Sequence, residues 1–266
     1  MARQGATDRV QNPDGQAVRK TKGVAGESGG ARLSVLHREE FGGFSGVNKG
    51  TDMKKEDIKI LVACEESQAV CKAFRELGIE AYSCDLLPCS GGHPEWHIQG
   101  DAIKEAYSGK YNAMIAHPTC TYIANSGVRW LYNKDGSKNK ERWEKLTDGA
   151  SFFKALFSSP IPFIAVENPI PHKYAVELIG RKYDQLIQPY HFGHAESKAT
   201  CLWLKGFPKL QHTNDVKELW RSLPKKEAQR LHYLSPGPER AKLRSKTFEG
   251  IAKAIAIQYT NYLLSL

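Results

Sequence analysis

Residues 58–67 have the sequence IKILVACEES, and this stretch decides the fold. Apart from Lys59, its first six residues are apolar and mostly branched, which is typical of a buried strand. Polar residues follow, and apolar side chains then recur at helical spacing along residues 67–77, where Gly78 marks a helix end. A buried strand that leads directly into a helix predicts the first unit of an α/β domain.

Further predicted strands follow at residues 80–84, 111–116 and 163–166, with a predicted helix over 145–157. Strands separated by helices imply a parallel sheet with right-handed crossovers. In such sheets the ligand lies beyond the carboxyl ends of the strands. The polar residues that follow the predicted strands are Cys64, Glu65, Asp85, His117, Cys120, Glu167 and Asn168.

The rest of the chain divides by composition. Residues 1–52 are rich in Gly, Arg and Ser without sustained periodicity, so we predict a flexible, disordered arm. Residues 53–266 form the predicted folded domain, with a strand over 201–204 and a closing amphipathic helix over 247–264. Residues 209–240 are polar and basic, and we expect a small insertion there.

Composition limits the function classes. The 266 residues are 41% hydrophobic and 25% charged, which is ordinary for a globular protein. The net charge of +9 favours anionic partners such as nucleic acid, and it suits a basic soluble enzyme equally well. There is no apolar run of about 18 residues, so no membrane span is expected. Six cysteines and no secretory signal indicate a reducing, cytoplasmic location.

The strand-end residues suit a particular kind of cofactor. Asp85 follows the second strand, where an acid commonly binds ribose hydroxyls, and Asp101 is placed to bind an adenine amino group. Glu65 and Glu66 occupy a first turn that has no glycine and would repel a pyrophosphate, which disfavours NAD and ATP. A cationic, phosphate-free cofactor such as S-adenosylmethionine fits better. Alternatively, these two acids only cap a helix.

Cys120 and Glu167 are the candidate catalytic residues. A free cysteine taken alone is more often structural than catalytic. However, Glu167 and Asn168 follow the strand predicted to lie beside the one that leads to Cys120. A thiol nucleophile paired with a carboxyl general acid can attack an electron-poor ring.

The order of these motifs resembles the cytosine carbon-5 DNA methyltransferases over roughly residues 58–262, most nearly the short phage-encoded methylase-like proteins. Residues 61–67 stand at the family's cofactor loop, and residues 117–120 resemble its Pro-Cys nucleophile loop. Residues 167–169 resemble its Glu-Asn-Val motif. The remaining similarities are at residues 85–88, 100–102, 197–201 and 244–248.

The resemblance implies a Rossmann-like S-adenosylmethionine-dependent methyltransferase fold over residues 53–266, with a mostly parallel sheet and a reduced target-recognition region. It implies DNA as partner and S-adenosyl-L-methionine as cofactor. Cys120 would add to carbon 6 of cytosine, Glu167 would bind ring nitrogen 3, Asn168 would fix the loop and Lys198 would hold the target. The implied cofactor-binding residues are Cys64, Glu65, Ser67, Asp85, Leu86, Asp101 and Pro118.

Three functions remain open from the sequence. The first is cytosine carbon-5 methylation of DNA, the second is modification of a pyrimidine in another substrate, and the third is nucleic-acid binding without catalysis. Adenine-N6 or cytosine-N4 methylation is disfavoured, because those enzymes carry a Pro-Pro-aromatic loop where this chain has the Cys120 thiol. The basic insertion, with Trp220 and Tyr233, could bind a phosphate backbone and stack a base, or be merely a solvated pair of helices.

A zinc site is the alternative role for a second group of residues. Cys84, Cys89, His93 and His97 offer four ligands within fourteen residues. Because the paired Cys-x2-Cys spacing is absent, we predict no metal there.

Overall fold

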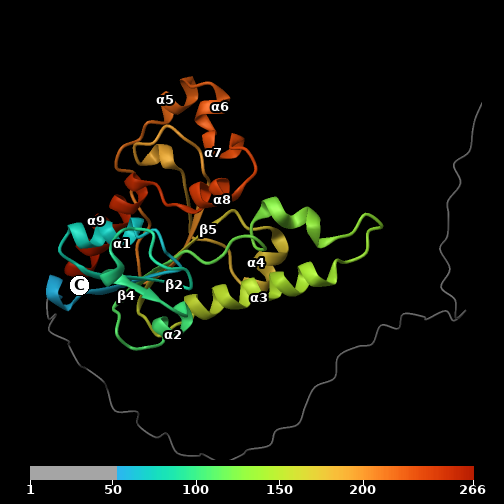
Figure 1. The fold of residues 1–266 in the computed structure, drawn as a ribbon. Coiled ribbons are helices and arrows are strands. Elements are labelled where there is room, and N and C mark those ends of the chain that lie inside the picture. Colours follow the sequence, from blue (N-terminus) through green and yellow to red (C-terminus); the bar gives the residue numbers. More distant parts are fainter. Residues whose placement is uncertain (1–52) are drawn as a thin grey trace, which may run out of the picture. The chain divides into compact units, whose positions relative to one another are not determined.

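A seven-stranded sheet organises the chain (Figure 1). The computed structural model describes residues 53–266, except for the side chains at 238, 239 and 241, so the predicted arm lies outside the described residues. The strands run in the order β3-β2-β1-β4-β5-β7-β6. Their bounds are β1 Lys59–Ala63, β2 Glu80–Asp85, β3 His97–Gln99, β4 Ala113–Ala116, β5 Phe163–Pro169, β6 Gln185–Ile187 and β7 Thr200–Lys205.

Strand direction confirms the predicted fold class, an α/β fold with a Rossmann-like, mostly parallel sheet. The five strands from β3 to β5 are parallel, and β7 is antiparallel to both of its neighbours, so the sheet is mostly parallel. The chain moves outward from β1 to β2 and β3, then returns to the other side of β1 at β4. That reversal creates the crevice at the carboxyl ends where α/β sheets bind ligands.

Helices cover both faces of the sheet. The α-helices are α1 Ala69–Glu76, α2 Ala102–Ala106, α3 Lys140–Phe157, α4 Lys173–Ile179, α5 Lys217–Ser222, α6 Lys225–Ala228, α7 Arg230–Tyr233, α8 Pro238–Ser245 and α9 Glu249–Leu264. Helices α1 and α9 pack together, and α3 packs against α2 and α4. Figure 1 shows α5 to α8 gathered away from these layers.

The alternation of β1 explains the two layers. Ile60 and Val62 belong to the core cluster that includes α1 and α9, whereas Leu61 and Ala63 belong to the cluster that includes α3. Successive strand side chains point to opposite faces, so a strand buried on both faces is an uninterrupted apolar run. This is why the run IKILVA indicated a buried strand.

Several elements differ from the sequence expectation. Helix α3 begins five residues earlier than predicted, because the Asn139 side chain accepts a hydrogen bond from the backbone N–H of Arg142 and caps a polar first turn. Strands β3 and β6 have three residues each, too short for a periodic signal. Four 3-10 helices, η1 Lys55–Asp57, η2 Pro94–Trp96, η3 Asn125–Leu131 and η4 Pro189–His191, complete the described chain.

Between residues 53 and 266, no helix is both long enough and apolar enough to cross a bilayer.

Candidate active site at the carboxyl ends of the strands

The β4 and β5 strands bring two chemical loops to the same edge. They pair in parallel with Ala116 opposite Val166, so the residues that follow each strand emerge together. His117 Nδ1 lies 2.8 Å from Glu167 Oε2, and both side chains are largely buried. Asn168 Nδ2 donates a hydrogen bond of 3.0 Å to the Pro118 carbonyl oxygen. Two polar contacts therefore join the loops.

The His117–Glu167 contact is an ion pair. Burial alone would lower the pKa of His117, but the hydrogen bond to Glu167 and the charges of Glu167 and Glu65 raise it above its usual value. Burial alone would raise the pKa of Glu167, but His117 and the charge of Lys198 hold it below its usual value. Both shifts favour the form in which the shared proton lies on His117 and Glu167 is a carboxylate.

Cys120 lies in the electrostatic field of Glu167. Its carbonyl oxygen accepts hydrogen bonds from the backbone N–H groups of Ile123 and Ala124, which turns the loop. Burial and then the negative charge of Glu167 raise the pKa of the thiol, whereas Lys198 and Arg244 oppose the rise. The free protein therefore holds Cys120 as a thiol.

Lys198 reaches the site through β7. The antiparallel register pairs Pro169 with Thr200, which places the residues before β7 beside the end of β5. A small pocket is lined by Glu167, Lys198, Thr200, Thr247, Phe248 and Ile251. Lys198 Nζ also donates to the Lys246 carbonyl oxygen at 3.0 Å. Three sequence motifs thus meet in one pocket, although Cys120 is not among its lining residues.

The first predicted cofactor turn has an unusual backbone. Cys64 and Gln68 adopt positive φ values of 61° and 58°, a region that favours glycine. The turn between them is thereby shaped without a glycine. The buried Gln68 side chain supports it, because its Nε2 donates to the His93 carbonyl oxygen at 2.8 Å and its Oε1 accepts from the His93 N–H at 3.0 Å. The sequence contains no signal for the role of Gln68, since no periodic pattern marks a buried amide.

Glu65 caps the start of helix α1, which is the alternative role that the sequence offered for it. Its Oε1 accepts from the Val70 N–H at 2.7 Å, and its Oε2 accepts from the Cys71 N–H at 3.2 Å. These are orphan donors of the first turn of α1. Glu65 is buried, and burial raises its pKa above the usual value. Both carboxylate oxygens are thus already engaged within the protein.

The other predicted cofactor residues surround the ends of β1, β2 and β3. Asp85 Oδ1 accepts from the Leu87 N–H, and Asp101 Oδ1 accepts from the Ile103 N–H and caps α2. Burial, with the charges of both acids, raises the pKa of the Cys64 thiol to about 12. Leu86 is 75% exposed. This edge is acidic, with an apolar side chain beside it, so the residues present fit a phosphate-free adenosine cofactor.

Two further predicted residues define the borders of this region. Ser67 is half-buried, and a side chain at Gly91 would lie 2.6 Å from its carbonyl oxygen, so the loop before η2 closely covers the turn. Pro118 is buried, and its carbonyl oxygen accepts from Asn168.

The four candidate zinc ligands have separate partners. The Cys84 thiol donates to the Gly100 carbonyl oxygen, and Cys89 donates to the side-chain oxygen of Gln68. His93 pairs with Glu95, and His97 contacts Ser83 and Leu87. Their ligand atoms are therefore directed to different groups.

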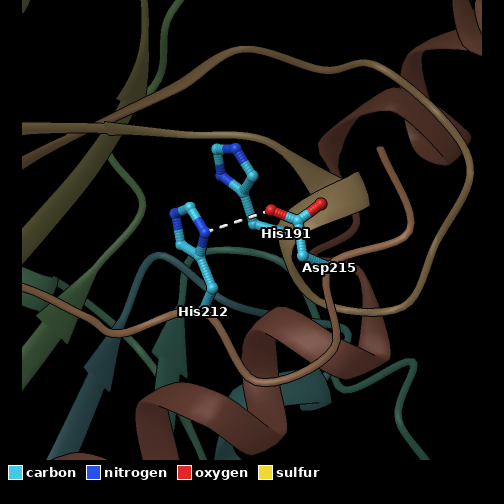
Figure 2. Close-up of side chains that lie close together, drawn as sticks. All are labelled: His191, His212 and Asp215. Atoms are coloured by element: carbon cyan, nitrogen blue, oxygen red, sulfur yellow. Dashed lines mark ion pairs between the residues drawn. The ribbon is translucent and has the colours of Figure 1, made fainter. Parts of the chain in front are cut away.

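A different trio brings metal-ligating atoms together (Figure 2). One ligand atom from each of His191, His212 and Asp215 lies within 4.8 Å of the others. His212 Nδ1 is 3.3 Å from Asp215 Oδ2, but the two imidazoles stack at 3.7 Å with only 12° between their planes. Nearly parallel rings do not aim their in-plane lone pairs at one point. The trio therefore connects η4 to the segment before α5 by stacking and ion pairing.

The shared field of Cys120 and Glu167 predicts a measurable coupling. In Glu167→Gln, the pKa of Cys120 should fall because the negative charge that raises it is gone. We expect iodoacetamide to modify Cys120 several-fold faster at mildly alkaline pH, as measured by peptide mass spectrometry, since the thiolate is the reactive form. Cys89 in the same digest is the internal control. An unchanged Cys120 rate would mean that the two side chains do not share an environment.

Comparisons with known proteins give limited similarity. No family model and no curated protein sequence matches the chain. A candidate DNA modification methyltransferase encoded within an Escherichia coli prophage has a TM-score of 0.38 and 14% identity, covering 63% of this chain and 56% of that one. A triple mutant of Spodoptera frugiperda DNMT2 has a TM-score of 0.33 and 10% identity, covering 60% and 54%. The chain spans little more than half the length of these two proteins.

Proposed function

We propose that this chain is an S-adenosylmethionine-dependent methyltransferase that acts on carbon 5 of cytosine in DNA through a covalent Cys120 adduct. The observation that carries the proposal is the His117–Glu167 ion pair at the carboxyl edge of the sheet, where the Asn168–Pro118 hydrogen bond joins it to the loop that carries Cys120. Glu167 is a buried carboxylate with the His117 imidazole 2.8 Å away as a proton donor. Such a pair is suited to exchanging a proton with a ring nitrogen.

Cys120 is the proposed nucleophile, and its raised pKa sets the first requirement. The thiol must lose its proton before the sulfur bonds to carbon 6 of the ring. Lys198 and Arg244 both lower the pKa of this thiol, so they favour the thiolate. If a bound substrate neutralised the Glu167 carboxylate, the negative charge that raises the pKa of Cys120 would be removed.

Glu167 and His117 would act together on ring nitrogen 3. As sulfur adds to carbon 6, negative charge develops on the ring, and a proton delivered to nitrogen 3 stabilises it. His117 Nδ1 holds that proton next to Glu167, so it can pass through the carboxylate to the base. Once carbon 5 has gained the methyl group, the hydrogen on that carbon must leave as a proton to water, and its electron pair expels the Cys120 thiolate from carbon 6. The proton on nitrogen 3 then returns by the same route.

Asn168 and Lys198 have positioning roles in this proposal. The Asn168–Pro118 hydrogen bond fixes the loop that carries Cys120 relative to Glu167. Lys198 places a positive charge beside Glu167 at the pocket, where it can hold an anionic group of the substrate.

The cofactor would lie at the acidic edge formed by Cys64, Asp85 and Asp101, with Leu86 beside its adenine. When bound, S-adenosylmethionine would supply an electrophilic methyl group for carbon 5. The carboxylates of Asp85 and Asp101 would orient hydroxyl and amino groups, and the backbone turn between Cys64 and Gln68 would accommodate close approach.

The proposal is tested by incubating the protein with labelled methyl donor and duplex DNA, single-stranded DNA or free pyrimidine nucleotides. We expect label in DNA as 5-methylcytosine, identified by mass spectrometry, with the target base flipped or already unpaired. Label in nucleotides alone would move the chemistry to another substrate. Absence of label, together with no calorimetric binding of S-adenosylhomocysteine, would refute the enzymatic function and favour a non-catalytic binding protein.

A further inference from the structure

An aromatic and basic surface extends from the segment that follows Cys120. We call it the Trp130 surface, defined by Arg129, Trp130, Tyr132, Lys138, Trp143 and Tyr174. It is formed by η3, the following turn, the start of α3 and the start of α4. Figure 1 shows the turn between η3 and α3 projecting beyond the start of α3.

Its aromatic rings pack on one another. The Trp143 ring lies 5.0 Å from Tyr174 and 6.1 Å from Tyr132, both edge to face. The Tyr132 hydroxyl donates to the Tyr174 hydroxyl at 3.1 Å. These contacts give the surface a fixed base from which the 55%-exposed Trp130 extends.

Cations lie directly over these rings. The Arg129 guanidinium is 4.5 Å from the Trp130 ring centre, and Lys138 Nζ is 4.7 Å from that of Trp143. Lys173 adds a third pair over Tyr174 at 4.8 Å. Within residues 53–266, neither Arg129 nor Lys138 forms a side-chain hydrogen bond or salt bridge, so both charges remain available to an anion.

The segment that leads to the Trp130 surface is joined to the strand end that carries Glu167. The Asn125 N–H donates to the Ile170 carbonyl oxygen at 2.8 Å, and Ala124 forms an isolated bridge with Pro171. These contacts join the start of η3 to the segment that follows Glu167 and Asn168. A ligand bound along the Trp130 surface could therefore continue toward Cys120.

The predicted basic insertion is less suited to the same task. The Trp220 ring stacks on Tyr190 at 4.7 Å, and its indole nitrogen is buried. Arg221 pairs with Glu218, and Arg230 pairs with Glu196. The insertion thus uses its tryptophan and two of its arginines in contacts with its own fold.

We infer that the Trp130 surface binds the single-stranded DNA that flanks the target base. This inference rests on the proposed function, since it names the path of the DNA at that site. Sequence-tolerant binding of single strands combines cations along the backbone with aromatic rings on which bases stack. Only unpaired bases expose the faces that Trp130 and Tyr132 could stack against, which favours a single strand over a duplex.

The test is fluorescence anisotropy of the full chain with a labelled deoxythymidine oligonucleotide, without cofactor. Trp130→Ala should weaken binding between about fivefold and about a hundredfold, the range for loss of one stacked base. The double variant Arg129→Ala and Lys138→Ala should reduce the slope of log K against log salt by about 0.7 for each phosphate that is no longer neutralised. Circular dichroism checks that each variant is folded.

Tyr233→Ala is the matched control, because Tyr233 is an aromatic residue of similar exposure in the insertion. Its binding should match that of the unchanged chain. The inference is overturned if the unchanged chain does not bind the oligonucleotide, if duplex DNA or RNA binds better, or if Tyr233→Ala weakens binding as much as Trp130→Ala. Binding that depends on Trp130 without any methyl transfer would support the surface while refuting the proposed enzyme.

Discussion

Replacing Cys120 by serine is expected to abolish methyl transfer to DNA while the protein stays folded. The serine hydroxyl is a far weaker nucleophile than a thiolate and cannot form the adduct at carbon 6. We expect a loss of at least about a thousandfold in turnover, in line with the effect of removing the nucleophile in other covalent catalysts. Incorporation of label from the methyl donor under single-turnover conditions measures it.

Cys89→Ser is the matched control for this variant. Cys89 is also half-buried, and its thiol donates to the side-chain oxygen of Gln68, a hydrogen bond that a hydroxyl can also make. Its transfer rate should stay close to that of the unchanged chain. A Cys120→Ser protein that transfers methyl groups near the native rate would show that Cys120 is not the nucleophile.

The second large effect is on stability, at Gly250. This residue lies in the first turn of α9, and its N–H donates to His194 Nε2 at 2.9 Å. A Cβ atom there would overlap the Phe192 carbonyl oxygen, so backbone must move. We expect Gly250→Ala to lower the free energy of unfolding by about 3 kcal/mol and the Tm by roughly 6–12 °C, as measured by thermal denaturation.

Gly149→Ala separates this steric effect from helix propensity. Gly149 lies in the middle of α3, and a Cβ atom there would be 3.6 Å from Ile123, an ordinary contact. Alanine should therefore stabilise this helix by up to about 1 kcal/mol. A Tm for Gly250→Ala equal to or above that of the unchanged chain would contradict the overlap. Because Thr247, Phe248 and Ile251 line the pocket, displacement of α9 should also weaken the proposed activity.

The buried parallel strands were the most predictable part of the fold. Apolar runs such as residues 58–63 need no partner to be recognised, since burial on both faces leaves no alternation. Strand β3 was not recognised, because three residues carry no period and its pairing with β2 is set by tertiary packing. The start of α3 was placed too late, because its first turn depends on the Asn139 cap and has no apolar stripe.

The candidate site was likewise only partly predictable from the sequence. Residue order alone predicted Cys120 and Glu167 at neighbouring strand ends. It did not predict the role of His117, because that role depends on the 2.8 Å contact with Glu167 across two loops. The sequence left two roles open for Glu65, and its hydrogen bonds to Val70 and Cys71 show the helix cap. Gln68 was missed, since its importance comes only from a left-handed backbone and a buried side chain.

By itself, the sequence determined the α/β class and the order in which chemical residues leave the strands, because hydrophobic periodicity and strand ends are local properties. Only the tertiary structure decided which of His117 and Glu167 is favoured to hold their shared proton. It alone also brought exposed cations over the aromatic rings around Trp130. Proton affinity depends on burial and neighbouring charge, and a surface depends on which segments fold side by side. Neither is encoded in the spacing of residues along the chain.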